Sequence, residues 1–459
     1  MQKIMKTDVM EIKALYELYK QHPVITTDSR DCPKGSIFLA LKGESFNGNK
    51  FALQALEKGC AYAIVDEESE ELRVKSEELA VVLHYNPIIK VADTLQTFKD
   101  LAREHRRQFD IPVIGITGTN GKTTTKELIA AVLGKKYNVM YTEGNFNNDV
   151  GVPKTLFRLN DSYDIAVVEM GASHPGDIKT LVETVEPTCG LITNVGRAHL
   201  QGFGSFEGVM KTKGELYDYL KRREERGERR ETCIFLDADN EYLVKMAKER
   251  DMKNVITYGS NVGKVVSCDP FVNFEWYNDQ SSVVVRTHLI GAYNISNILA
   301  AMTVGKYFDV PADKIREAIE EYTPSNNRSQ LTITADNRLV VDAYNANPTS
   351  MAAAIENFKA IKSDKELKKM AIIGQMGELG DVAEEEHQKV LQQLTDANLD
   401  KIWLVGEGSW DIAAGRPGIK IFKDVEEVKT AIGNEKPCGY YILIKGSHSN
   451  RLDKIVELL

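Results

Sequence analysis

The sequence predicts an α/β protein of three domains, and three observations support this. Its 459 residues suggest about three domains of ordinary size. Short apolar runs alternate with helical patterns, which is typical of buried parallel strands joined by helices. After Pro112 an apolar strand passes through a glycine-punctuated loop directly into a helix. This arrangement is common at the nucleotide sites of doubly wound sheets.

Changes of pattern divide the chain into three regions. The expected boundaries are, in chain order, 1–108, 109–322 and 323–459. In the first region, residues 36–41 are expected to form a strand, and residues 94–109 show the apolar spacing of a helix. Pro112 and Pro324 lie close to the two boundaries, as expected for residues that interrupt regular structure.

The middle and last regions both predict parallel sheets covered by helices. In the middle region the continuous apolar strands are 165–168, 191–195 and 233–236, and we expect a doubly wound sheet there. In the last region the expected strands are 339–341, 371–374, 402–405 and 441–444. Their alternation with helices predicts a second, Rossmann-like α/β domain.

Composition and charge are those of an ordinary enzyme. Apolar residues make up 42% of the chain and charged residues 27%. A net charge of -9 argues against a nucleic-acid or anionic-membrane surface. The six cysteines form no Cys-x-x-Cys pair, so we expect reduced thiols in a cytoplasmic protein. Residues 1–13 contain no apolar core of signal-peptide length, and no stretch is long enough to span a membrane.

Residues 113–125 predict a site for nucleotide phosphates. The strand 111–116 leads into Thr-Gly-Thr-Asn-Gly-Lys-Thr-Thr, and a helix begins at Thr123. Backbone N–H groups of such a loop converge on a phosphate at the positive end of the helix. Lys122 can reach the terminal phosphates, and the Thr123 hydroxyl can hold Mg²⁺. An ordinary strand–turn–helix connection is the alternative. The expected ATP-binding residues here are Gly118, Thr119, Asn120, Gly121, Lys122, Thr123 and Thr124.

Further polar residues follow strands of the same sheet. Ligands of open α/β sheets lie beyond the carboxyl ends of the strands, where Glu169 and His199 are expected. A carboxylate such as Glu169 is suited to Mg²⁺. Alone, Glu169 could be an exposed strand-end residue, and a lone His is more often packed or solvated than a ligand. Lys213 lies 14 residues after His199, and composition does not distinguish it from Lys211.

Together these residues resemble the Mur ligase superfamily. The motifs are Thr117-Gly-Thr-Asn-Gly-Lys-Thr-Thr, Glu169-Met-Gly, Asn194 with His199, and Lys213-x-x-x-Tyr217. Members are ATP-dependent amide-forming ligases of peptidoglycan synthesis, and folylpolyglutamate synthase is a relative. The resemblance implies that the catalytic residues are Lys122, Glu169, His199 and Lys213. It also implies that Thr123, Glu169, His199 and Lys213 hold two Mg²⁺ ions and that Lys213 is carbamylated.

The resemblance covers the whole chain. It implies a UDP-substrate-binding domain, a central phosphate-loop ATPase domain and a C-terminal ligase domain. Asn294, in Leu289-Ile-Gly-Ala-Tyr-Asn294, would read the adenine base. Arg328 would approach the ATP phosphates and Asp342 the ribose. The implied substrate-binding residues are Ser29, Arg30, Lys42, Asn145, Asn147, Asn148, Tyr344, Asn345 and Asn347.

One segment narrows the resemblance within the family. Asp342-Ala-Tyr-Asn-Ala-Asn-Pro348 is similar to the segment of members that add D-alanyl-D-alanine to UDP-N-acetylmuramoyl-tripeptide, whereas other members usually carry a His-containing sequence there. Residues 374–380 and 445–452 are also similar to the corresponding segments of those members. Two positions differ from these members: Gln375 stands where Asp is common, and His448 stands where Arg is common. Because the second change removes a permanent positive charge, no anion-binding role is expected for His448.

The expected reaction follows from these resemblances. ATP phosphorylates the substrate carboxylate, and the amine of the dipeptide then displaces phosphate. Closure of the last domain over the middle one would exclude water from the acyl phosphate. We expect a monomer without nucleic-acid partners or membrane insertion. The alternatives are another Mur ligase or a folylpolyglutamate synthase, a P-loop kinase or NTPase, and a ligand-binding protein without catalysis. The sequence leaves open whether the third peptide residue is meso-diaminopimelate or lysine.

Overall fold

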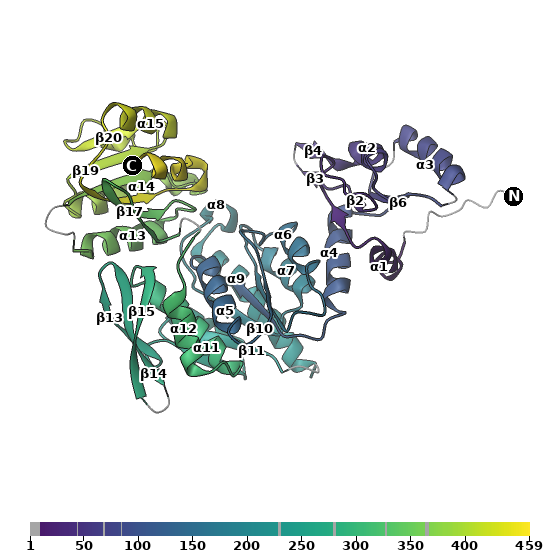
Figure 1. The fold of residues 1–459 in the computed structure, drawn as a ribbon, viewed down its shortest axis with the longest axis horizontal. Coiled ribbons are helices and arrows are strands. Elements are labelled where there is room, and N and C mark those ends of the chain that lie inside the picture. Colours follow the sequence, from purple (N-terminus) through teal and green to yellow (C-terminus); the bar gives the residue numbers. More distant parts are fainter. Residues whose placement is uncertain are drawn as a thin grey trace. The chain divides into compact units, whose positions relative to one another are not determined.

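The structure is a computed structural model in which the chain forms two compact units (Figure 1). It describes residues 10–43, 45–67, 69–83, 85–227, 231–278, 281–325, 328–362 and 367–459. Residues 1–9, on which part of the signal-peptide argument rests, lie outside this set. The smaller unit comprises Met1–Ile111, Thr142–Tyr163 and Thr180–Glu186, and the larger unit comprises Pro112–Tyr141, Asp164–Lys179 and Pro187–Leu459. The expected three-domain α/β fold is confirmed, while the expected boundaries stay predictions.

A four-stranded parallel sheet forms the centre of the smaller unit, in the order β1-β2-β5-β6. Its strands are β1 (Ile25–Thr26), β2 (Ile37–Leu39), β5 (Tyr62–Val65) and β6 (Ile88–Lys90). A hairpin of β3 (Lys42–Gly43) and β4 (Phe46–Asn47) follows β2, and the 3-10 turn η1 (Gly48–Phe51) follows the hairpin. The helices are α1 (Ile12–Gln21), α2 (Ala52–Glu57), α3 (Glu70–Leu83), α4 (Thr94–Arg106) and α6 (Gly151–Leu156).

Helix α4 joins distant parts of the smaller unit. It begins where the Asp93 carboxylate accepts a hydrogen bond from the backbone of Gln96 (2.7 Å), and such caps favour helix initiation. On its buried face, the Phe98 ring stacks on the Phe157 ring at 5.6 Å. His105 Nε2 lies 3.0 Å from the carbonyl oxygen of Leu159. These contacts explain why residues 142–163, from the expected middle region, belong to the same unit as residues 1–111.

The larger unit contains the expected doubly wound sheet, in the order β12-β11-β10-β7-β9-β8, with every pair parallel. Its strands are β7 (Val113–Thr117), β8 (Val139–Tyr141), β9 (Ile165–Glu169), β10 (Cys189–Ile192), β11 (Cys233–Asp237) and β12 (Val255–Tyr258). Strands β7, β9, β10 and β11 are buried throughout, as their apolar runs predict. Because β7 lies between β9 and β10, the loop after β7 is flanked by the carboxyl ends of both neighbours.

The helices of this region cover the sheet (Figure 1). They are α5 (Lys122–Leu133), α8 (Leu200–Phe203), α9 (Phe206–Glu225), α10 (Glu241–Glu249), α11 (Asn294–Tyr307) and α12 (Ala312–Glu321). Helix α7 (Asp177–Val185) begins in the larger unit and continues into the smaller one. Within the described residues, none of these helices combines the length and apolar character that crossing a bilayer requires.

A three-stranded antiparallel sheet adds to the middle region and was not among the expected elements. It consists of β13 (Gly263–Cys268), β14 (Phe271–Asn278) and β15 (Ser281–Ile290). Every second residue in the middle of β14 points into the core that also contains α11, namely Val272, Phe274 and Trp276. This two-residue period is the signal from which the sequence could have predicted the central strand.

The last region is a six-stranded sheet in the order β16-β17-β21-β18-β19-β20, in which only the β16–β17 pair is antiparallel. Its strands are β16 (Gln330–Ile333), β17 (Asn337–Asp342), β18 (Lys368–Gly374), β19 (Lys401–Val405), β20 (Ile419–Phe422) and β21 (Tyr440–Lys445). Its helices are α13 (Pro348–Ala360), α14 (Ala383–Asp396) and α15 (Val425–Asn434). Successive residues of β18 enter separate apolar clusters on the two faces, as expected for a sheet covered on both sides.

The close packing of α9 on β10 yields a test of the fold. A Cβ atom on Gly190 would lie 2.4 Å from Leu220 Cδ1 and 3.2 Å from Leu216 Cγ. We therefore expect Gly190→Val to destabilise the protein by about 1–3 kcal/mol, because it overpacks this core. The readout is the thermal unfolding midpoint. Gly433→Ala, in the last turn of α15 with no heavy atom within 4 Å, is the control and should not lower it. An unchanged midpoint for Gly190→Val would contradict the packing.

Candidate active site

The phosphate loop, residues 117–124, requires glycine at two positions. Gly118 and Gly121 have φ angles of 143° and 79°, a region that other residues rarely adopt. A Cβ atom on Gly118 would lie 2.0 Å from Thr193 Oγ1, and one on Gly121 would lie 2.5 Å from Asn297 Oδ1. The loop backbone therefore approaches both neighbours more closely than any larger residue would allow.

Hydrogen bonds fix the loop to the segment that follows β10. The backbone N–H groups of Thr119 and Asn120 donate to the carbonyl and the side-chain oxygen of Asn194, both at 3.0 Å. The Asn120 carbonyl accepts from the Thr193 hydroxyl (2.6 Å) and the Asn194 amide (3.0 Å). Asn194, which the sequence predicted only as part of a motif, thus holds the shape of the loop.

Lys122 lies along this loop. Its Nζ donates to the carbonyl oxygens of Gly118 (2.8 Å) and Thr119 (3.1 Å). Burial lowers the pKa of Lys122, while Glu169 opposes this shift and Arg328 adds to it. A phosphate anion at the loop would stabilise the charged form of this lysine.

Glu169 and Thr123 lie together, as the sequence predicts. The Thr123 hydroxyl donates to Glu169 Oε2 at 2.9 Å, and both side chains are buried. Sequence reasoning missed Lys126, whose Nζ lies 3.9 Å from the same oxygen and which is only 1% exposed. Lysine is almost never fully buried without a partner. A lysine at an otherwise apolar, inward-facing position of α5 was the available signal.

His199 is held beside the cationic residues of the site. It adopts a φ of 50° just before α8, and its Nδ1 contacts the carboxylate of Glu378 from the last region. Burial lowers the pKa of His199; Glu378 opposes the shift, and Lys122 and Lys213 add to it. His199 therefore shares an electrostatic environment with both lysines.

Lys213 lies on α9 and is buried, with its Nζ 5.4 Å from the centre of the Phe203 ring. Burial lowers its pKa well below the usual value, and Lys122 adds to this effect. Lys211, two residues earlier, is exposed. The structure thus separates two lysines that composition could not distinguish.

Asn294 connects α11 to α5. Its side-chain amide donates to the Ile290 carbonyl (2.8 Å), and its side-chain oxygen accepts from Asn297 (2.9 Å). Asn297 in turn accepts from the Thr125 hydroxyl of α5 at 3.0 Å. The contacts give Asn294 a structural role beside the phosphate loop, and its expected contact with adenine stays a prediction.

The two residues of the last region that are expected to contact ATP, Arg328 and Asp342, have partners within that region. The Arg328 guanidinium lies 3.8 Å from the centre of the Tyr344 ring, in a cation–π contact. Asp342 is paired with the buried Lys445 at 2.5 Å, and Lys445 also donates to the Asn345 carbonyl (3.3 Å). These contacts hold the segment 342–345 in place, and its expected role in ligand binding stays a prediction.

Asn347 reaches the phosphate loop. Its side-chain oxygen caps α13 by accepting from the Ser350 N–H (2.9 Å), and its amide donates to Asn120 Oδ1 (2.8 Å). Sequence reasoning assigned Asn347 to the substrate and did not anticipate these two contacts. The segment 342–348 is therefore connected directly to the loop.

The other expected substrate residues lie in the smaller unit, and their role stays a prediction. Ser29 is buried, while Arg30 is exposed and donates from Nε and Nη2 to the Asp28 carboxylate. Lys42 is ion-paired with two carboxylates. Asn148 accepts from the backbone at the start of α6, at Gly151 (2.8 Å). Asn145 and Asn147 are linked by a backbone hydrogen bond of 2.7 Å.

The donor set around Glu169 suits Mg²⁺, which takes oxygen ligands and usually retains waters and substrate phosphates in its coordination shell. Thr123 and Glu169 supply a hydroxyl and a carboxylate beside the phosphate loop. Among the described residues, no three His, Cys, Asp or Glu side chains converge on one point. A metal at this position would therefore depend on nucleotide oxygens to complete its coordination.

Comparisons with known proteins agree with this geometry. Residues 23–106 match the model described as the Mur ligase family catalytic domain, residues 116–305 the Mur ligase middle domain, and residues 327–448 the Mur ligase glutamate ligase domain. The UDP-N-acetylmuramoyl-tripeptide–D-alanyl-D-alanine ligase of Synechocystis sp. is 34% identical over 439 residues, covering 95% of this chain and 91% of the relative. The ligase of the same name from Bacillus subtilis is 31% identical over 446 residues, covering 94% and 92%.

A solved structure is similar across all regions of the fold. The crystal structure of the MurF ligase from Thermotoga maritima in complex with ADP has a TM-score of 0.81 and 25% identity, and the match covers 96% of this chain and 97% of that one. The similarity extends through both the phosphate loop and the last region, so it does not depend on one common motif.

The contacts of Lys122 lead to a test of the loop. We expect Lys122→Ala to abolish nucleotide-dependent turnover with little effect on the thermal unfolding midpoint, because its Nζ lies on the loop and not in an apolar cluster. ADP release and a thermal melt measure the two effects separately. Near-normal turnover in this variant would exclude the phosphate-loop interpretation.

Proposed function

Because the chain belongs to the Mur ligase family, we propose that it adds D-alanyl-D-alanine to UDP-N-acetylmuramoyl-tripeptide in peptidoglycan precursor synthesis, with release of ADP and phosphate. Family membership makes the chain an ATP-dependent ligase. The observation that carries the choice of substrates is similarity along 94–95% of the chain to ligases named for this reaction. The Asp342–Pro348 segment supports the same choice.

The chemistry requires activation of a poor acyl donor. A carboxylate oxygen of the tripeptide attacks the γ-phosphorus of ATP, the bond to the bridging oxygen breaks, and ADP leaves. The dipeptide amine then attacks the carbonyl carbon of the acyl phosphate, loses a proton, and phosphate departs. Lys122 lies where it can neutralise charge on the phosphoryl group.

The buried pair of Thr123 and Glu169 is our proposed Mg²⁺ site. The Thr123 hydroxyl and the Glu169 carboxylate would hold the metal, which would neutralise negative charge on the nucleotide phosphates. Lys126 places a positive charge 3.9 Å from the buried Glu169 carboxylate. Asn194 and Thr193 keep the loop backbone directed toward the phosphates.

We also propose that Lys213 is carbamylated. Only a neutral amine can attack carbon dioxide, and burial together with Lys122 favours the neutral form of Lys213. The new N–C bond releases one proton and leaves an anionic carbamate. Such an anion would be attracted to Lys122, and together with His199 it would supply ligands for a second Mg²⁺.

The other expected properties are also proposals. All six cysteines are free thiols in the structure, which agrees with a cytoplasmic protein. We propose a monomer that acts on a nucleotide-linked precursor. A P-loop kinase or NTPase would not require an amine acceptor, and another Mur ligase would prefer a single amino acid. The choice of acceptor therefore distinguishes all three possibilities.

The decisive experiment measures ADP release with UDP-N-acetylmuramoyl-tripeptide, ATP and a panel of acceptors. We expect D-alanyl-D-alanine to exceed L-alanine, D-glutamate and L-lysine by about 10⁴-fold in kcat/KM, because a site that hydrogen-bonds a dipeptide leaves buried polar groups unpaired when a shorter acceptor binds. The tripeptide should be tested with either meso-diaminopimelate or lysine as its third residue.

Two variants refine this measurement. Asn345→Ala should raise the KM for the dipeptide more than that for ATP. Asn347→Ala should raise both the KM for the dipeptide and the KM for ATP, because Asn347 also contacts Asn120 of the phosphate loop. Equal turnover with a single amino acid would contradict the proposed substrates but not the family.

The carbamate proposal has its own test. We expect Lys213→Ala to lose most activity and short carboxylic acids to restore part of it, because a small anion can occupy the vacated position. Lys211→Ala is the matched control on the same helix and should have a mild effect, since Lys211 is exposed. Mass spectrometry of the native enzyme measures the modification directly. An active enzyme with an unmodified Lys213 would contradict this role.

A further inference from the structure

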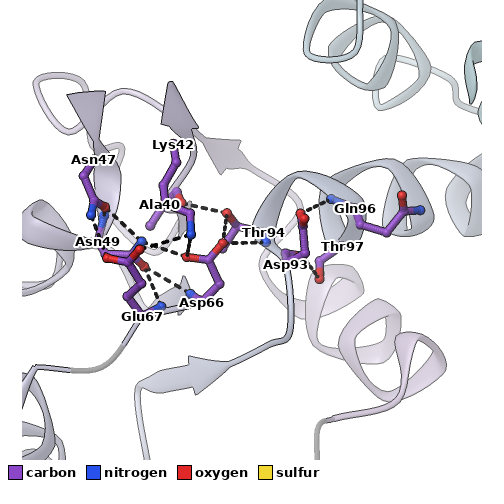
Figure 2. Close-up of polar contacts among 10 residues, drawn as sticks. All are labelled: Ala40, Lys42, Asn47, Asn49, Asp66, Glu67, Asp93, Thr94, Gln96 and Thr97. Atoms are coloured by element: carbon purple, nitrogen blue, oxygen red, sulfur yellow. Dashed lines mark hydrogen bonds and ion pairs between the residues drawn. The ribbon is translucent and has the colours of Figure 1, made fainter. Parts of the chain in front are cut away.

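A polar cluster in the smaller unit surrounds Lys42, one of the expected substrate residues. It forms where β2 and β5 end and α4 begins, and Figure 2 shows its contacts. Because parallel strands place their carboxyl ends at one edge of a sheet, this is the edge where open α/β sheets bind ligands. The β3–β4 hairpin, which carries Lys42 and Asn47, belongs to this cluster.

Asp66, directly after β5, is the centre of the cluster (Figure 2). Its side chain is only 3% exposed. It accepts from Asn49 Nδ2 (2.8 Å) and from both the N–H and the hydroxyl of Thr94 (3.1 Å each), and Lys42 Nζ lies 3.2 Å away. Burial opposes ionisation of this carboxyl, but the bonds from Asn49, Thr94 and Lys42 outweigh it and lower its pKa. One buried carboxylate thus connects the hairpin, η1 and α4.

Asn49 transmits this restraint to the hairpin. Its amide donates to both Asp66 and Asn47 Oδ1 (2.9 Å), and its side-chain oxygen accepts from the backbone of Asp66 (3.1 Å) and Glu67 (3.3 Å). The side chain is therefore engaged at both ends. Rotation of Asn49 would break contacts with β4 and with the end of β5 together.

The base of the hairpin is fixed by close backbone packing. Gly48 N donates to the Leu41 carbonyl at 2.9 Å, and a Cβ atom on Gly48 would lie 2.5 Å from that oxygen. At the other end of the hairpin, the Phe46 ring stacks on Phe51 at 5.3 Å and is 47% exposed. The hairpin is thus held from its base and along one side, while its polar residues remain accessible to a ligand.

Lys42 is an accessible cation of the cluster, with 42% of its side chain exposed, beside Glu67, which is 53% exposed. It lies 3.2 Å from both Asp66 and Glu67, and Glu67 also accepts from Asn47 (2.7 Å). The lysine ammonium is thereby held in one place and is not left to sample many rotamers. A ligand that contacts Lys42 or Asn47 meets groups that are already ordered, which reduces the entropic cost of binding.

From this geometry we infer that Asp66 is a positioning residue for the UDP-linked substrate, acting through Lys42 and Asn49 on the β3–β4 hairpin. The inference rests on the proposed function and on the sequence-based prediction that Lys42 and its surroundings bind the UDP-linked substrate. Asp66 itself is too buried to make the contact. Its effect should therefore appear in the affinity for one substrate and not in the chemical step.

The test compares steady-state constants of the full-length enzyme. We expect Asp66→Asn to raise the KM for UDP-N-acetylmuramoyl-tripeptide about tenfold, because the ion pair with Lys42 is lost. The values of kcat and of the KM for ATP and for the dipeptide should change by less than about twofold. Calorimetric titration with UDP-N-acetylmuramoyl-tripeptide should show the same loss of affinity.

Asp93→Ala is the matched control. Asp93 caps α4 next to Thr94 but makes its side-chain bond to Gln96 and not to the hairpin (Figure 2). This variant should lower the thermal midpoint and leave the KM for the UDP-linked substrate unchanged. An equal rise in KM for both aspartate variants would overturn the inference, since it would indicate general loosening of the unit.

A double variant tests the route of the effect. If Asp66 acts through Lys42, adding Lys42→Met to Asp66→Asn should raise KM no further than the larger of the two single changes, because coupled residues are not additive. Thr94→Val has nearly the same shape and removes the hydroxyl, whose single hydrogen is shared between the Asp66 carboxylate (3.1 Å) and the Ala40 carbonyl (2.8 Å). It should raise the same KM a few-fold, and it provides the test if Asp66→Asn does not fold.

The outcomes separate the two proposals. Suppose that the wild type turns over the UDP-linked tripeptide and that Asp66→Asn has a normal KM for it. This result would overturn the role of Asp66 but not the proposed function. If Asp66→Asn does not fold, a normal KM in Thr94→Val has the same meaning. A wild-type enzyme that ignores the UDP-linked tripeptide but uses another carboxylate substrate would overturn the proposed function and this inference with it.

Discussion

The close approach of the phosphate loop to the end of β10 is the constraint on which the larger unit depends. Only a residue without a Cβ atom fits at Gly118, because Thr193 lies directly beside it. Asn194 then fixes the backbone of Asn120, and Asn120 receives the amide of Asn347. This short loop therefore contacts both the middle sheet and the last region, so its conformation is determined by both.

Buried charge is the second feature of this unit. Lys126 and Lys213 are buried in or beside the site, Lys122 is half-buried on the loop, and the buried carboxylate of Glu169 lies 3.9 Å from Lys126 Nζ. Removing charged groups from water destabilises a fold unless they are paired. Strongly perturbed titratable groups that gather in one place are typical of functional sites. A nucleotide phosphate, or a carbamate on Lys213, would offset the excess of positive charge.

The sequence predicted those parts whose information is local. The phosphate loop, the buried strands and the partnership of Thr123 with Glu169 depend on neighbouring residues and on the rule that parallel strands end at one edge. Lys213 could be chosen only through a family resemblance, because its burial depends on the packing of α9. The second contacts of Asn347 and the burial of Lys126 were missed for the same reason. Each depends on residues that are brought near only by the tertiary fold.

The smaller unit is built from three separate stretches of the chain, which limits where the protein can be cut or exchanged with a homologue. Its core is completed by Phe157 and by the carbonyl of Leu159, which lie about fifty residues beyond α4 in the chain. During synthesis, the nascent chain cannot finish this core until those residues have left the ribosome. An exchange of the first region between homologues would likewise have to include residues 142–163, because Phe98 and His105 would otherwise face an unmatched surface. The first region is thus not by itself a complete unit for recombination.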